Sequence, residues 1–285
     1  MKLTFMGTGA SEGIPAFRCL CPVCSEAREK GGRHIRQNAS LHLQSGSGIN
    51  VLIDMPPQIK MMLEKYSLSD TALDIILFTH YHIDHTGGIF HLLESMANNG
   101  HVPTGKPLKV YMPDDCYRTA MEGMYAGQPD MGRSDYREFY SLEVLRSLEK
   151  LSPGTLKVLA LDTNHLAGHP AVPYKRECHG YLFTENGRSA AYMVDSSAEL
   201  PPATVEVLLC QKLDCLIYEC TFDRFPGMGR GHSDHEGVLA VRDLFRPERM
   251  IITHISHRNF SNDRLASFME KHGIETAWDG MKIEV

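Results

Sequence analysis

The segment His80-x-His82-x-Asp84-His85 constrains what this chain can fold into more than any other feature. Three imidazoles and one carboxylate within six positions supply enough nitrogen and oxygen donors to begin two metal sites side by side. The preceding run, residues 73–78, is mostly apolar and is typical of a buried strand. The donors therefore stand where a strand ends and a loop opens, a context that favours a functional site over a histidine-rich surface turn.

Three further candidate ligands occupy the same kind of position. His165, Asp195 and His254 each stand one step past an apolar, β-like run, as His80 does. A single histidine at a strand end is more often structural than a metal ligand. Four such positions in one chain reverse that expectation, because strand ends can converge at one rim of a β-sandwich.

The rest of the chain predicts an α/β protein of one domain, residues 1–285. Strands come first and helices are interleaved, and this order occurs twice, which indicates two β-layers with helices outside them, an αββα sandwich. A polar, periodic stretch around residues 113–150 is compatible with a helical insertion. No apolar stretch approaches the ~20 residues of a membrane span. With a net charge of −6 there is no basic field for a nucleic-acid backbone, so we expect neither a membrane nor a nucleic acid as partner.

The cysteines indicate reduced, metal-binding thiols. Eight are too few for a disulfide scaffold in 285 residues, and Cys19, Cys21 and Cys24 crowd into six positions. Thiolates select zinc, and a closed tetrahedral site needs a fourth donor from elsewhere. A redox role for two of the thiols is the alternative. The N-terminus reads as a first strand, not as a signal peptide, so we expect a cytoplasmic protein.

Taken together, these residues resemble the metallo-β-lactamase superfamily over nearly the whole chain. The resemblance implies ligands for one divalent metal (His80, His82 and His165), for a second (Asp84, His85 and His254), and a bridge between them (Asp195). It further implies that Asp54 orients the ligands without binding metal. From the residues alone, Asp54 is equally well explained as a turn former before Pro56.

A narrower resemblance concerns the N-terminal glycine turn, the cysteine cluster and the segment 253–257. These features are similar to a group that includes phosphoribosyl cyclic phosphate phosphodiesterases and pyrroloquinoline-quinone biosynthesis B proteins. In that group the fourth zinc donor is a histidine from a distant loop. His232, after Gly231, matches that place and is therefore predicted to close a structural zinc site with the three cysteines.

The resemblance implies a metal-dependent hydrolase with Zn, Mn or Fe at the catalytic site. The intact ligand motif favours a phosphodiesterase acting on a small cyclic phosphodiester through a metal-bridging hydroxide, with Asp84 among the catalytic residues. One departure is Phe222, where the phosphodiesterases have a histidine that assists the leaving group. His257 is a candidate substitute acid, although a packing role is equally expected.

Several alternatives use the same ligands. A quinone-biosynthesis-like role, thioester or lactone hydrolysis, or oxygen chemistry with iron would each suit this metal set. A carrier that has kept the fold without catalysis is a further alternative, although it would not need an open dinuclear centre. The sequence is also compatible with a homodimer.

Overall fold

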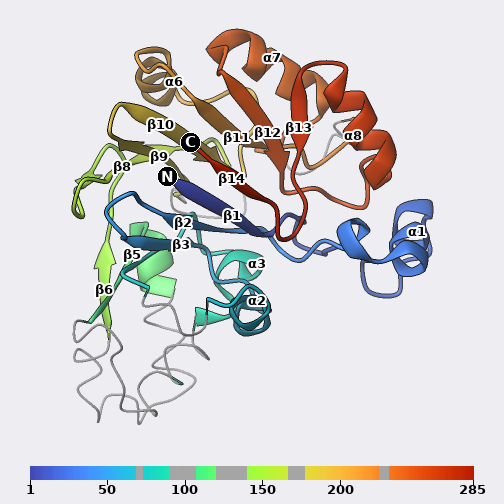
Figure 1. The fold of residues 1–285 in the computed structure, drawn as a ribbon, viewed down its shortest axis with the longest axis horizontal. Coiled ribbons are helices and arrows are strands. Elements are labelled where there is room, and N and C mark those ends of the chain that lie inside the picture. The colour runs from blue at the N-terminus through green and yellow to red at the C-terminus, as the bar shows by residue number, and fades with distance from the viewer. Residues whose placement is uncertain (69–72, 90–94, 96–106, 120–139, 166–176, 225–230) are drawn as a thin grey trace.

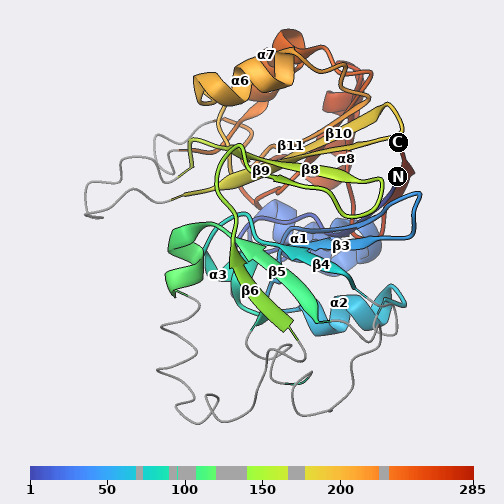
Figure 2. The same ribbon diagram turned by 90° about the vertical axis from the view of Figure 1, so that its left-hand side faces the viewer.

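The computed structural model describes residues 1–68, 73–89, 95, 107–119, 140–165, 177–224 and 231–285. Two seven-stranded sheets pack face to face, with helices on both outer surfaces (Figure 1, Figure 2). The first sheet has the order β14 (Lys282–Glu284), β1 (Lys2–Gly7), β2 (Ser40–Gln44), β3 (Asn50–Ile53), β4 (Ile75–Leu77), β5 (Leu108–Met112) and β6 (Tyr140–Val144). The second has the order β13 (Ile274–Thr276), β12 (Arg249–Thr253), β11 (Cys215–Glu219), β10 (Arg188–Met193), β9 (His179–Glu185), β8 (Lys157–Asp162) and β7 (Lys150–Leu151).

The main apolar core lies between the two sheets. It contains alternate residues of strands from both, such as Leu41 and Ile53 from the first sheet and Tyr192 and Ile217 from the second. Strands in the middle of each sheet are buried on both faces, which explains why β4 and β11 read as nearly continuous apolar runs. Burying these side chains stabilises the sandwich by roughly 1.5–3 kcal/mol for each large residue.

Helices cover the two outer faces. Helix α2 (Ile59–Lys65) packs Ile59 and Met62 against the outer face of the first sheet. The outer face of the second sheet is covered by α6 (Pro202–Leu209), α7 (His235–Phe245) and α8 (Asn262–Glu270), as Figure 2 shows. The predicted four-layer αββα sandwich is confirmed. Two more helices, α1 (Pro22–Lys30) and α3 (Ile83–Thr86), include the last cysteine of the cluster and the last two donors of the histidine motif, and a short 3₁₀ turn spans Gly32–His34.

The predicted helical insertion around residues 113–150 is wrong for its last part. Residues 114–119 are helical, residues 120–139 lie outside the described residues, and Tyr140–Val144 and Lys150–Leu151 are strands. Strand β6 pairs in parallel with β5 at the edge of the first sheet. The apolar residues of 140–144 alternate with polar ones, as in a strand and not as in a helix. None of the helices described combines the length and apolar character needed to cross a membrane.

The topology brings several strand ends to one edge of the sandwich. Strands β3 and β4 are parallel in the first sheet, and β10, β11 and β12 are parallel in the second. The carboxyl ends of parallel strands meet at one edge, where ligands of open α/β sheets bind. The loops that carry the predicted ligands start there.

Candidate metal centre

Three histidines form the first group of donors. The Nε2 atom of His80 lies 2.9 Å from Nδ1 of His82, and Nε2 of His165 lies 3.4 Å from the same atom. Zinc–nitrogen bonds of ~2.0–2.1 Å in a tetrahedron place ligand nitrogens roughly 3.3 Å apart. Burial lowers the pKa of His165 to about 3 and also lowers the pKa of His80, so both imidazoles are neutral, the form that ligates a metal.

A second group lies beside the first. The Nε2 atom of His85 is 3.2 Å from Oδ2 of Asp84, and Nε2 of His254 is 3.9 Å from the same oxygen. Burial opposes protonation of His85, yet the surrounding carboxylates of Asp84, Asp195 and Asp54 raise its pKa well above the usual value. The site therefore carries excess negative charge, which attracts a proton or a metal cation.

Asp195 stands between the two groups. Its Oδ1 lies 3.6 Å from Nε2 of His165, whereas its Oδ2 lies 3.1 Å from Nε2 of His85 and 3.4 Å from Nε2 of His254. One carboxylate oxygen thus faces each group. This is the geometry that a bridging ligand between two cations requires.

Within the part of the chain that the structure describes, three buried atoms at this place have no hydrogen-bond partner: Nε2 of His85, Oδ2 of Asp195 and Nε2 of His254. Buried polar atoms are normally paired, because leaving one unpaired costs about 1–3 kcal/mol. All three face the same point between the second-group side chains. A divalent cation would satisfy them together, so the residues fit a metal.

The Nδ1 atoms of His80, His85 and His254 contact neighbouring residues that do not belong to the two donor groups. His85 donates its Nδ1–H to Oδ2 of Asp54 at 2.7 Å, and the Thr79 backbone N–H donates to Oδ1 of the same carboxylate at 2.8 Å. The Nδ1 atoms of His80 and His254 each lie 3.0 Å from a threonine hydroxyl, of Thr79 and Thr221 respectively. These contacts fix the rings with Nε2 turned inward. Asp54 itself contacts Nδ1 of His85, on the side of the ring opposite the Nε2 atom that faces the donors.

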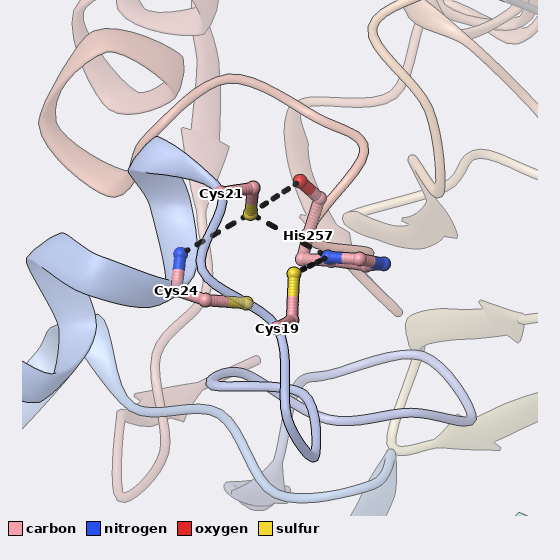
Figure 3. A group of neighbouring side chains, drawn as sticks. All are labelled: Cys19, Cys21, Cys24 and His257. Atoms are coloured by element: carbon pink, nitrogen blue, oxygen red, sulfur yellow. Dashed lines mark hydrogen bonds between the residues drawn. The ribbon is translucent and has the colours of Figure 1, made fainter.

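The structure corrects the predicted zinc cluster. The Sγ atoms of Cys19, Cys21 and Cys24 converge with a ring nitrogen of His257, not of His232 (Figure 3). Nδ1 of His257 lies 3.2 Å from Sγ of Cys19 and 3.6 Å from Sγ of Cys21. The loop after β12 passes beside the N-terminal loop, since Ala10 N–H donates to Ile255 O at 3.1 Å, and this pairing brings His257 to the thiols.

The three thiols are not equivalent. Hydrogen bonds from the Cys21 backbone and side chain lower the pKa of Cys19 to about 7. Burial raises the pKa of Cys24 to about 12. A thiolate is the form that binds metal, so Cys19 is ready to ligate and Cys24 needs the cation itself to lose its proton. None of the eight cysteines, all within the described residues, forms a disulfide.

His232 instead belongs to the metal centre. It donates Nδ1–H to Oε2 of Glu219 at 2.9 Å, and its ring stacks on that of His254 with a centroid distance of 5.5 Å. Glu219 is fully buried at the end of β11, a strand-end acidic residue that the sequence analysis missed although the same signal identified Asp195. Gly231 allows this approach, because a Cβ atom there would come within 2.5 Å of the His165 backbone.

Residues 49–255 match the beta-lactamase superfamily domain, a range that contains every donor of the metal centre. The chain belongs to this superfamily. Over 99% of both chains it is 24% identical to coenzyme PQQ synthesis protein B of Methylobacillus flagellatus. The solved structures that share its fold include the following two. A diphosphatase from the PhnP family has a TM-score of 0.79 and 22% identity, covering 100% of this chain and 97% of the other. Zinc-bound PqqB from Methylobacterium extorquens has a TM-score of 0.80 and 18% identity over the whole of both chains.

These similarities confirm the resemblance noted from the sequence. Membership of the metallo-β-lactamase superfamily implies divalent-metal binding, and the converging donors described above fit it. A pocket of about 390 Å³ opens onto the centre and is lined by Asp84, Asp195 and His254 together with His232. The pocket extends as far as His257 at the cysteine cluster, so the two donor clusters border one cavity. In this superfamily member, a ligand above the metal centre would therefore also contact the loop that carries His257.

Proposed function

We propose that this protein is a metal-dependent phosphodiesterase that hydrolyses a small phosphodiester at a centre of two divalent cations. The observation that carries the proposal is the position of Asp195, with one carboxylate oxygen toward each donor group. When bound, two cations supply an activated water and neutralise charge on the phosphoryl oxygens. The similarity to a diphosphatase supports phosphoryl chemistry.

His232 supplies the acid that the sequence analysis found missing at Phe222. Its ring lies beside Phe222, with a centroid distance of 6.0 Å, and Glu219 holds its Nδ1–H. Nε2 is thereby directed away from Glu219. Hydrolysis adds water across one P–O bond, and the departing oxygen takes a proton from His232. This role replaces the one predicted for His257, whose Nδ1 is engaged by the cysteine cluster.

We also propose that Cys19, Cys21, Cys24 and His257 hold a structural zinc ion. Four protein donors close a tetrahedral site and leave no open position for water or substrate. Such a site contributes to folding and takes no chemical part in hydrolysis.

The second candidate function is a role in quinone biosynthesis. The alignment with coenzyme PQQ synthesis protein B over 99% of each chain favours it. Hydrolysis of a thioester or lactone would use the same ligands, so substrates must separate these functions.

The test is metal analysis of protein purified without added metal, followed by assays with aryl phosphodiesters, lactones and thioesters. We expect two metals at the centre and hydrolysis of diesters, with Asp195→Ala losing most activity and Asp243→Ala, a surface change on α7, losing none. Metal-replete protein that cleaves lactones or thioesters but no diester would refute the phosphodiesterase.

A further inference from the structure

A cationic residue, Arg258, is among the residues that line the pocket over the metal centre. Arg258 lines the same cavity as Asp195 and His254 and is exposed. Within the described residues, no carboxylate oxygen lies within 4.0 Å of its guanidinium nitrogens. An unpaired guanidinium at the edge of a small-molecule pocket is available to bind an anion.

The backbone of Arg258 is held firmly relative to the metal centre. Its N–H donates to Oγ of Ser256 at 3.1 Å, and that hydroxyl donates to Oε1 of Glu12 at 2.5 Å. The next residue, Asn259, donates its side-chain N–H to the Cys220 carbonyl at 2.8 Å. These bonds place Arg258 at a constant position four residues beyond His254.

Glu12 lines the pocket as well, yet its carboxylate is already engaged. It accepts hydrogen bonds from Ser256 and from the His257 backbone N–H, the latter at 3.2 Å, and Ser11 donates to its second oxygen at 3.3 Å. Glu12 therefore holds the loop in place. The charge of Arg258 remains for a ligand.

We infer that Arg258 binds a second anionic group of the substrate, phosphoryl or carboxylate, while the phosphodiester lies at the metal centre. This inference rests on the proposed phosphodiesterase function. A guanidinium presents a planar fork of donors that matches either group, and charge-assisted bonds of this kind are among the stronger ones in proteins. Arg258 would thus determine which diesters are preferred without taking part in the hydrolysis.

The experiment uses three diesters with the same 4-nitrophenyl leaving group and a propyl arm that ends in a hydroxyl, a carboxylate or a phosphate. With the metal-loaded protein, we expect kcat/KM to be about 10- to 100-fold higher for at least one of the two anionic arms than for the hydroxyl arm. The difference between carboxylate and phosphate identifies the anion.

Three variants separate the effect of Arg258 from general charge effects. Arg258→Met should abolish the preference, so that kcat/KM for the anionic arms falls to the value that the same variant shows for the hydroxyl arm. Arg258→Lys should retain part of it. The matched control is Arg246→Met, which removes one positive charge from the end of α7, outside the pocket.

Binding gives a readout that does not depend on hydrolysis. Calorimetry with propane-1,3-diyl bisphosphate and with propyl phosphate should show tighter binding of the bisphosphate to the wild type and to Arg246→Met, but not to Arg258→Met. Absence of diester hydrolysis would refute the phosphodiesterase alone, because the binding comparison still tests Arg258. If the wild type shows no anion preference in hydrolysis or binding, or if Arg258→Met keeps it, the inference is wrong.

Discussion

At the scale of single residues, three side chains of the metal centre are held by an uncommon backbone. Asp54, Asp195 and His254 have φ values of 61°, 51° and 53°, in the left-handed region that residues other than glycine seldom adopt. Each lies within two residues of a strand end. Such conformations cost of order 1–3 kcal/mol and persist where the surroundings impose them. Here they turn Asp195 and His254 toward each other at the metal centre, and Asp54 toward Nδ1 of His85.

The prediction at this scale concerns His232. His232→Ala should lower kcat by about 10²- to 10⁴-fold for a diester with an alkyl leaving group, because an alkoxide needs a proton. The same variant should lower kcat far less for a 4-nitrophenyl diester, whose leaving group is stable without one. Steady-state kinetics with both substrates measures the contrast. His272→Ala, at a half-buried position outside the pocket, is the control, and an equal loss for both substrates would contradict an acid role.

At the scale of elements, the loop after β12 joins the two donor clusters. It begins with His254 at the metal centre and reaches the cysteine cluster at His257, three residues later. Its conformation therefore depends on both clusters. A metal held by the cysteines and His257 would stabilise one wall of the substrate pocket, although this metal would not be part of the catalytic metal centre.

Cys21→Ser tests this dependence. We expect the variant to lose one zinc per chain and several degrees of melting temperature, since zinc binding contributes directly to folding. The folded fraction should also show a raised KM with a smaller change in kcat, because the loop bearing Arg258 loses an anchor. Cys210→Ser, which changes an exposed cysteine after α6, is the control. Unchanged zinc content in Cys21→Ser would argue against the site.

A second element-scale prediction concerns pH. Asp214, before β11, accepts hydrogen bonds from Ser189 N–H at 2.8 Å and from Arg188 at the start of β10. Burial favours its neutral form, but these bonds lower its pKa below the usual value. The carboxylate therefore stabilises the fold above pH ~4, and that contribution is lost as pH falls through the lowered pKa.

Asp214→Asn should consequently lower the free energy of unfolding by about 1 kcal/mol at pH 7. The difference from wild type should shrink as the pH is lowered below ~4. Urea unfolding of both proteins between pH 7 and 3 measures it. A difference that stays constant over this range would show that ionisation of Asp214 is not involved.

At the scale of the whole molecule, one buried arginine joins distant parts of the chain. Arg36 is 2% exposed and donates to Oγ1 of Thr8 at 2.7 Å, to the Ala277 carbonyl at 2.6 Å and to Oδ1 of Asn262 at 2.7 Å. These partners lie after β1, after β13 and at the start of α8. The two chain ends are also paired, because β14 lies against β1 in the first sheet.

Arg36→Met should lower the free energy of unfolding by about 3–5 kcal/mol, because the buried acceptors of Thr8 and Ala277 and the half-buried one of Asn262 lose their donor and Met supplies none. Denaturant unfolding measures the change. Arg33→Met, at an exposed position nearby, should have an effect within about 0.5 kcal/mol. A loss below 1 kcal/mol for Arg36→Met would mean that water replaces the lost donor.

The sequence by itself determined the layers of the sandwich and the donors at the ends of its strands. Apolar runs with strand periodicity predict buried strands, and polar residues that follow them fall at the carboxyl edge. The segment 140–144 escaped prediction, because an alternation of only five residues inside a long polar stretch is a weak strand signal. The donors His80, Asp195 and His254 could be predicted from their positions just after apolar strands.

Only the tertiary structure decided which histidine meets the cysteines. His232 and His257 both stand in loops after strands of the second sheet, and spacing along the chain does not say where a loop folds. Gly231, which has no side chain, lies against the His165 backbone and brings His232 to Glu219, whereas the pairing of Ala10 with Ile255 brings His257 to Cys19. Both outcomes depend on contacts between segments more than 60 residues apart. Local sequence carries no record of such contacts, because packing of the whole chain creates them.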